Sequence, residues 1–295
     1  MHVLDLQLVM EAKPLKADGI GYNNSKKGVK RKRCKQRVNR RFSPFLQSLF
    51  EICEEMFKER GSVPLPSDVE RTCHLLGKHR DNMKAEDVGL SGDLPFFKCY
   101  GEDEDPARVT SSTIYTCDRF TLCIFIIPWK ARIPLHDHPG MTVFSKLLLG
   151  KMQIKSHDFV NPLNIDKITE APPDVKLAKV ITEGELSAPC KACVLYPSKG
   201  GNIHELTAIT PCLILDVIGP PYSKEEGRDS SYYLDFPYQT WPCEVPKDGF
   251  HYRWLQEIDK PEDSEMDIIP YLGPKPVPTV LRKLNSYFKS MSTIL

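Results

Sequence analysis

The sequence predicts a mainly β protein: a jelly-roll barrel with a small helical region in front of it. From about Phe96 the chain divides into short runs rich in β-branched and aromatic residues, punctuated by Gly and Pro, which is typical of antiparallel β domains. Before that point, apolar residues recur at spacings of three and four, the pattern of helices with one buried face. The expected strands are Ser112–Tyr115, Phe120–Ile127, Thr142–Leu149, Lys151–Phe159, Val175–Thr182, Ala192–Tyr196, His204–Ala208 and Cys212–Gly219.

The helical region is expected within residues 43–95. Ser43 can cap a first helix with its hydroxyl group. Ser67 and Glu70 have the spacing of a capping box at the start of a second helix, which Gly77 would end. We expect both helices to pack against the barrel.

Proline-rich chain follows the last expected strand. Pro is frequent between residues 220 and 246 and again between residues 261 and 278. Because Pro cannot donate a backbone hydrogen bond to a sheet, we expect irregular chain there that wraps the barrel edges. Residues 43–295 would then form one domain, with residues 220–295 as its outer wrapping.

Charge separates an N-terminal arm from this domain. Residues 1–41 contain 12 Lys or Arg and 3 Asp or Glu, whereas the remainder contains 28 and 36. A segment this charged cannot bury a core, so residues 1–42 are expected to be a disordered basic arm. Its clusters, Lys26–Lys27 and Lys30–Arg33, suit a nuclear localisation signal or a nucleic-acid contact, and a merely solvated tail explains them equally well.

Composition excludes other classes. No apolar run reaches the roughly 20 residues of a membrane-spanning helix. The N-terminus carries Asp5 and lacks the basic start of a signal peptide. The 10 Cys are irregularly spaced and are expected to be reduced thiols. We therefore expect no membrane contact and a location in the nucleus and cytoplasm.

The stretch Ile133–Gly140 carries the first chemical signal. In an extended chain successive side chains alternate between faces, so His136 and His138 point the same way and Asp137 points oppositely. Two imidazoles on one face form half of a metal site, which could hold iron, zinc, copper or nickel.

A third ligand must come from elsewhere, and His204 is the best candidate. The pair Gly200–Gly201 allows a tight turn that delivers His204 at the start of an expected strand. His157 is the rival, in a polar strand without such a turn. The sequence thus predicts a metal site of His136, His138 and His204.

Three parts of the chain carry a resemblance to a known family. They are Pro134–Met141, then Leu195–Pro197 with Gly200–His204, then Asp216 with Gly219–Tyr222. Together they resemble the plant cysteine oxidases, which are thiol dioxygenases of the cupin superfamily and have cysteamine (2-aminoethanethiol) dioxygenase as their animal relative. The resemblance covers the chain after the basic arm and implies the double-stranded β-helix of cupins.

The family also suggests the metal. Met141, Thr142 and Val143 stand where the first cupin motif usually has a carboxylate ligand. The resemblance associates this departure with thiol dioxygenases and implies Fe(2+) held by the three His. Three neutral ligands leave the ion its full double positive charge, which favours binding of a substrate thiolate.

Two further residues match the family's site. Asp216 lies in the apolar run Cys212–Gly219, where a carboxylate is costly unless it is paired. We expect it over the metal, accepting a hydrogen bond from a bound water or the substrate's ammonium group, and a buried structural hydrogen bond is the alternative. Tyr222 is expected to donate its hydroxyl to bound oxygen or substrate, with packing at the rim as the alternative.

The resemblance implies an enzyme that uses O2 to oxidise the N-terminal cysteine of target proteins to cysteine sulfinic acid. Family members mark ethylene-response transcription factors for the arginine N-degron pathway when oxygen is present, so we expect an oxygen sensor. The expected partners are O2 and such proteins, without direct nucleic-acid binding, and the chain is expected to be a monomer. Two alternatives stay open: another metal-dependent cupin enzyme, and a non-catalytic nuclear cupin that binds a ligand or DNA through residues 26–41.

Cysteine spacing supplies a weaker signal. Cys190 and Cys193 form a CxxC pair, but no second pair exists to complete a structural zinc site. Cys193 is therefore expected to be a core thiol in a strand and Cys190 a loop residue. Cys212 could lie near the iron.

Overall fold

The computed structural model describes residues 43–284, apart from residues 60, 62, 78–82, 91–107, 161–170 and 242–247. The basic arm expected at residues 1–42 lies outside the described residues. Two helices, α2 (Pro44–Met56) and α3 (Pro66–Leu76), precede the strands. The strands are β1 (Thr110–Thr116), β2 (Thr121–Ile127), β3 (Arg132–His136), β4 (Thr142–Leu149), β5 (Lys151–Phe159), β6 (Val175–Ser187), β7 (Cys193–Leu195), β8 (Ile203–Ala208), β9 (Cys212–Gly219), β10 (Tyr232–Pro237), β11 (Tyr252–Ile258) and β12 (Asp267–Ile268).

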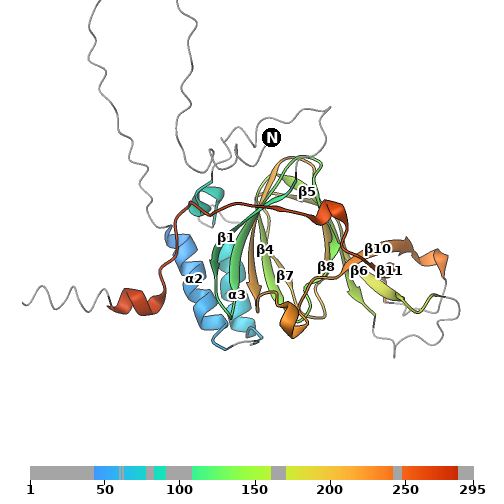
Figure 1. Cartoon of the computed structure of the whole chain (residues 1–295), viewed down its shortest axis with the longest axis horizontal. Coiled ribbons are helices and arrows are strands. Elements are labelled where there is room, and N and C mark those ends of the chain that lie inside the picture. The colour runs from blue at the N-terminus through green and yellow to red at the C-terminus, as the bar shows by residue number, and fades with distance from the viewer. Residues whose placement is uncertain are drawn as a thin grey trace, which may run out of the picture.

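The strands form two sheets (Figure 1). One has the order β12-β1-β2-β9-β4-β7. The other, β10-β11-β6-β5-β8-β3, closes into a barrel because Tyr232 on β10 pairs with His136 on β3. All the expected strands are present, so the prediction of a mainly β double-stranded β-helix with a small helical region is confirmed.

The helices pack on the outer face of the first sheet (Figure 1). On β9, Leu213, Leu215 and Val217 join the same core cluster as α2. Side chains alternate along a strand, so the residues between them face the opposite way. The other face of β9 therefore turns Asp216 into the interior between the sheets, where it lines a cavity.

The helix caps agree only in part with the sequence expectation. Ser43 caps α2, because its hydroxyl accepts a hydrogen bond from the amide of Leu46 at 3.2 Å. The capping box expected at Ser67 is wrong: α3 starts one residue earlier, at Pro66, and its first turn has no side-chain cap. A Pro at the first helical position needs no partner for a missing N–H and fixes φ in the helical range, so it starts the helix without one.

The proline-rich chain contains more regular structure than expected. The prediction of irregular chain over residues 220–246 is wrong at β10, which pairs with β11 along its length. Its single Pro, Pro237, is the last residue of the strand. No described helix has the length and apolar composition needed to cross a membrane.

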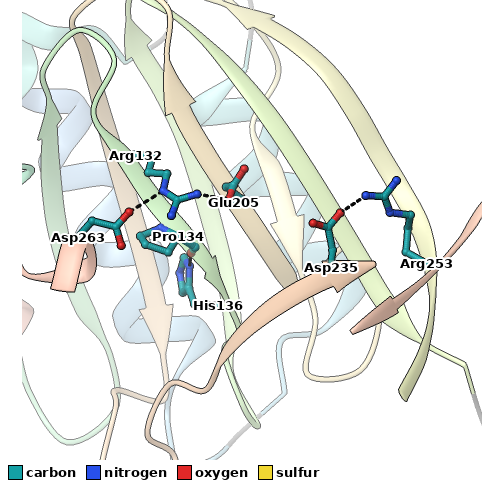
Figure 2. Close-up of polar contacts among 7 residues, drawn as sticks. All are labelled: Arg132, Pro134, His136, Glu205, Asp235, Arg253 and Asp263. Carbon is teal, nitrogen blue, oxygen red and sulfur yellow. Dashed lines mark hydrogen bonds and ion pairs between the residues drawn. The ribbon is translucent and has the colours of Figure 1, made fainter. Parts of the chain in front are cut away.

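After β11 the chain crosses the barrel and returns to α2 (Figure 1). Its contacts include one at the barrel and one at the helix. At the barrel, the Arg132 guanidinium on β3 donates to Asp263 at 2.7 Å and to Glu205 on β8 at 3.3 Å (Figure 2). At the helix, the Gln47 side-chain amide bonds both the N–H and the C=O of Val277. The crossing segment also supplies Ser264 and Met266 to the wall of the interior cavity.

Candidate metal centre

Three buried histidines meet inside the barrel. His136 is the last residue of β3 and is paired across the ladder with His204 on β8. His138 lies two residues beyond the end of β3, and its ring centroid is 5.0 Å from that of His136 and 5.1 Å from that of His204. One ligand nitrogen from each ring lies within 4.8 Å of the other two. Among the described residues, no acidic or cysteine side chain joins this group.

The spacing of the nitrogens fits one small metal ion. The Nε2 atoms of His138 and His204 are 3.5 Å apart. A metal–nitrogen bond of about 2.1 Å separates two ligands by roughly 3.0–3.4 Å at octahedral to tetrahedral angles. The observed separation is thus close to that of two ligands on a shared ion.

The outer nitrogens of two rings are already engaged. His136 Nδ1 lies 2.8 Å from the carbonyl oxygen of Pro134 (Figure 2), and His138 Nδ1 lies 2.6 Å from the hydroxyl of Tyr222. A carbonyl can only accept, so Nδ1 of His136 carries the proton and Nε2 presents its lone pair inward. Burial lowers the pKa of all three rings, which keeps them in the neutral form that binds metals.

The histidines line a cavity of about 240 Å³ between the two sheets. Its other walls are mainly apolar, with Phe125, Ile214 and Ile218 contributed by the strands of the first sheet. Apolar walls exclude water and strengthen electrostatic interactions inside the cavity.

Asp216 is the acidic group of the opposite wall. Its residue is 8% exposed, and its Oδ1 has no hydrogen-bond partner among the described residues. Burial raises the pKa of this carboxyl to about 7, against a smaller opposing effect of a hydrogen bond from Ser145. A buried oxygen without a partner is costly, so this atom is available to a group that enters the cavity.

Tyr222 lines the cavity beside His138. Although 40% of the residue is exposed, its hydroxyl reaches in to His138, and the ring lines the cavity wall. Burial raises the pKa of this phenol, which keeps it neutral. The hydroxyl therefore engages a histidine of the site directly.

The remaining candidates do not belong to the histidine group. His157, on β5, is buried among charged residues of β10 and β11 and is not part of the histidine group. Cys193 begins β7 and Cys190 precedes it, and both are free thiols. Cys212 is buried at the start of β9, with its thiol against the backbone carbonyls of Lys151 and Thr210, and does not line the cavity.

The sequence analysis missed two residues that hold the backbone next to the histidines, Asn202 and Asp158. Asn202 bonds the backbone of His138 through its side chain, and Asp158 accepts three backbone N–H groups of the turn before His204. Asn202 stands inside a recognised motif, but its partner is 64 residues away. Asp158 lies in a strand of mixed polar residues, where nothing local marks it.

A β barrel that brings three neutral imidazoles to one interior cavity is a metal-binding cupin. Comparison with known sequences then gives the family: the PCO_ADO family model matches residues 80–276. The chain is 40% identical to plant cysteine oxidase 2 of Arabidopsis thaliana over 83% of this chain and 87% of that one. It is also 29% identical to human 2-aminoethanethiol dioxygenase, over 58% and 69% of the two chains. The chain belongs to the PCO_ADO family and is a thiol dioxygenase.

Two solved structures resemble the chain distantly. KdgF from Halomonas sp. is 12% identical with a TM-score of 0.28, covering 43% of this chain and 96% of its own. A cupin superfamily protein from Desulfitobacterium hafniense is 12% identical with a TM-score of 0.27, covering 40% and 84%.

Proposed function

We propose that this thiol dioxygenase holds Fe(2+) on His136, His138 and His204 and oxidises the N-terminal cysteine of target proteins to cysteine sulfinic acid. The observation that carries the proposal is the all-imidazole group, which no carboxylate of the described residues joins. Such a set leaves a dication uncompensated and therefore receptive to a thiolate. The relatives, plant cysteine oxidases and 2-aminoethanethiol dioxygenases, support a thiol as the oxidised group.

The reaction balances without a further reductant. A thiol R–SH and O2 give the sulfinic acid R–SO2H, so both oxygen atoms end on sulfur and the four electrons come from it. When bound, ferrous iron supplies the one-electron chemistry that O2 requires. The protein binds the cysteine end, excludes water with the apolar walls and places charge around the sulfur.

Asp216 and Tyr222 have separate tasks in this proposal. Asp216 faces the histidines from the opposite sheet with a free oxygen, and it accepts a hydrogen bond from the substrate's ammonium group or from a water beside the sulfur. Tyr222 is a positioning residue, because with Nε2 of His138 on the metal its hydroxyl oxygen accepts a hydrogen bond from Nδ1–H and so holds the ring in that orientation.

The cellular part of the proposal follows from the family. We infer that the chain acts as an oxygen sensor in the nucleus and cytoplasm, as a monomer. Its substrates would be ethylene-response transcription factors, which enter the arginine N-degron pathway once their N-terminal cysteine is oxidised. Residues 26–41 would act as the nuclear localisation signal.

One experiment tests the chemistry. Protein loaded with Fe(2+) is incubated with a peptide that begins with Cys, in air and under nitrogen, and the peptide is followed by mass spectrometry. We expect a gain of two oxygen atoms in air alone, and none with an N-acetylated Cys peptide or with zinc-loaded protein. An unchanged peptide in air, with iron bound, would refute the proposed substrate class.

A further inference from the structure

His138 is held differently from the other two ligands. His136 and His204 sit opposite each other in the β3–β8 ladder, so backbone pairing fixes both. His138 lies past the end of β3 and has no ladder partner. The Asn202 side chain bonds both the backbone N–H and the C=O of His138, at 3.0 Å each, and this C=O also accepts a hydrogen bond from the N–H of Met141 at 3.2 Å.

The Asn202 amide substitutes for a strand partner. Its Oδ1 accepts from the N–H of His138, while its Nδ2 donates to the C=O of His138 and, at 2.7 Å, to the C=O of Tyr196. The residue is only 5% exposed. Because one side faces a donor and the other faces two acceptors, a single orientation of the amide satisfies all three bonds.

Asp158 fixes the backbone of Asn202 in turn. Its Oδ1 accepts from the N–H of Gly201 at 2.8 Å and of Asn202 at 3.1 Å, and its Oδ2 accepts from the N–H of Gly200 at 2.8 Å. Both glycines have positive φ, and a Cβ on Gly201 would meet the Ser156 side chain at 2.5 Å. The turn therefore has one shape, which the carboxylate locks from the neighbouring strand.

We infer that Asn202 is a positioning residue of the metal centre, which holds His138 in register with His136 and His204 and is itself held by Asp158. The contacts form one chain from β5 through the turn before β8 to the loop after β3. These contacts hold His138, the histidine of the three that is not paired in the β3–β8 ladder. The inference rests on the metal centre proposed above.

A purely structural role for Asn202 predicts something different. If the amide only stabilised the fold, its loss would lower the melting temperature and leave metal affinity unchanged. The chain offers a matched control in Gln47, which is 3% exposed and also bonds the N–H and C=O of one residue, Val277, far from the site. Asn202→Asp and Gln47→Glu both keep the acceptor and put a carboxylate oxygen against a carbonyl.

The test is a titration of metal-free protein with Co(2+), followed by visible absorption, together with the melting temperature of each metal-free variant. We expect Asn202→Asp to weaken Co(2+) binding about 10- to 100-fold and to shift the absorption bands, because outer partners of ligands have effects of this size. Gln47→Glu should lower the melting temperature yet bind Co(2+) as the unaltered protein does, with the same bands.

The outcomes separate this inference from the proposed function. Co(2+) affinity of Asn202→Asp within threefold of the unaltered protein overturns the inference alone, as does an equal loss in Gln47→Glu. No Co(2+) binding by the unaltered protein overturns the proposed centre and the inference with it. Should Asn202→Asp fail to fold, Asn202→Ala and Gln47→Ala answer the same question, because neither buries a new charge.

Discussion

The two walls of the cavity differ in how their polar atoms are satisfied. On the wall of β3 and β8, the outer nitrogens of His136 and His138 already have partners within the protein. On the wall of β9, Oδ1 of Asp216 has none among the described residues. Both walls are buried, so they differ in hydrogen bonding and not in exposure to solvent.

This difference separates binding the metal from acting on the substrate. When Nδ1 of a histidine is hydrogen-bonded to the protein, its Nε2 points into the cavity. The histidines of the first wall therefore already have the orientation that binds a metal ion. An unpartnered buried carboxylate oxygen is stabilised only when the cavity is filled. The first wall should therefore control metal content, and the second should control turnover at full metal content.

The largest effect is expected from breaking the first wall. His204→Ala removes one of three ligands, so we expect loss of bound iron and a fall in peptide oxidation of at least about a thousandfold, measured by metal analysis and mass spectrometry. His157→Ala is the matched control, a buried histidine on the neighbouring strand β5. The His157→Ala variant should keep its bound iron. Equal metal loss in both variants would contradict the assignment of His204.

The second wall is expected to give the next largest effect. Asp216→Asn keeps the size and one acceptor oxygen but removes the charge, so we expect kcat/KM for the peptide to fall about a hundredfold at unchanged iron content. Asp263→Asn, on the outside of the barrel beside Arg132 (Figure 2), should leave turnover unchanged. Iron loss in Asp216→Asn would show that this carboxylate belongs with the metal ligands.

Local signals in the sequence predicted most of the fold. Strand runs between turn residues identified the strands of the first sheet except β12, and β5, β6 and β8 of the barrel, but not β3, β10 and β11. The Ser43 cap identified the start of α2. The position of β10 was missed because Pro is frequent around it, although the one Pro within it is its last residue and leaves its pairing with β11 intact. The start of α3 was missed because Pro66 competes with a capping box as a start signal, and the two lie one residue apart.

The parts of the site that depend on residues close together in the sequence could be predicted. Alternation placed His136 and His138 on one face, and the Gly pair marked the turn before His204. The contacts that secure these ligands depend on pairing between distant strands: Asp158 reaches the turn only because β5 lies beside β8. The same holds for the hydroxyl of Tyr222, whose partner His138 is 84 residues away. No local pattern encodes such distances.

A third prediction uses the pH dependence of stability in the metal-free protein. Burial raises the pKa of Asp216 to about 7, well above its value in the unfolded chain, so the folded state binds this proton more tightly. Raising the pH from 5 to 8 should therefore destabilise the unaltered protein relative to Asp216→Asn, by about 2–3 kcal/mol. Urea unfolding of both proteins at the two pH values measures this difference in the free energy of unfolding, since the contributions of the other titrating groups are the same in both proteins. A constant difference would contradict the raised pKa.

The smallest effect is expected where the two walls meet, at Tyr222. Tyr222→Phe leaves the proton on Nδ1 of His138 buried without its acceptor, so Fe(2+) should bind about tenfold more weakly, while turnover at saturating iron changes little. Tyr232→Phe removes the hydroxyl of the other tyrosine in the cavity wall and should leave the affinity unchanged. If Tyr222→Phe instead binds iron normally and loses turnover, its hydroxyl acts on substrate or oxygen, and Tyr222 belongs functionally with Asp216.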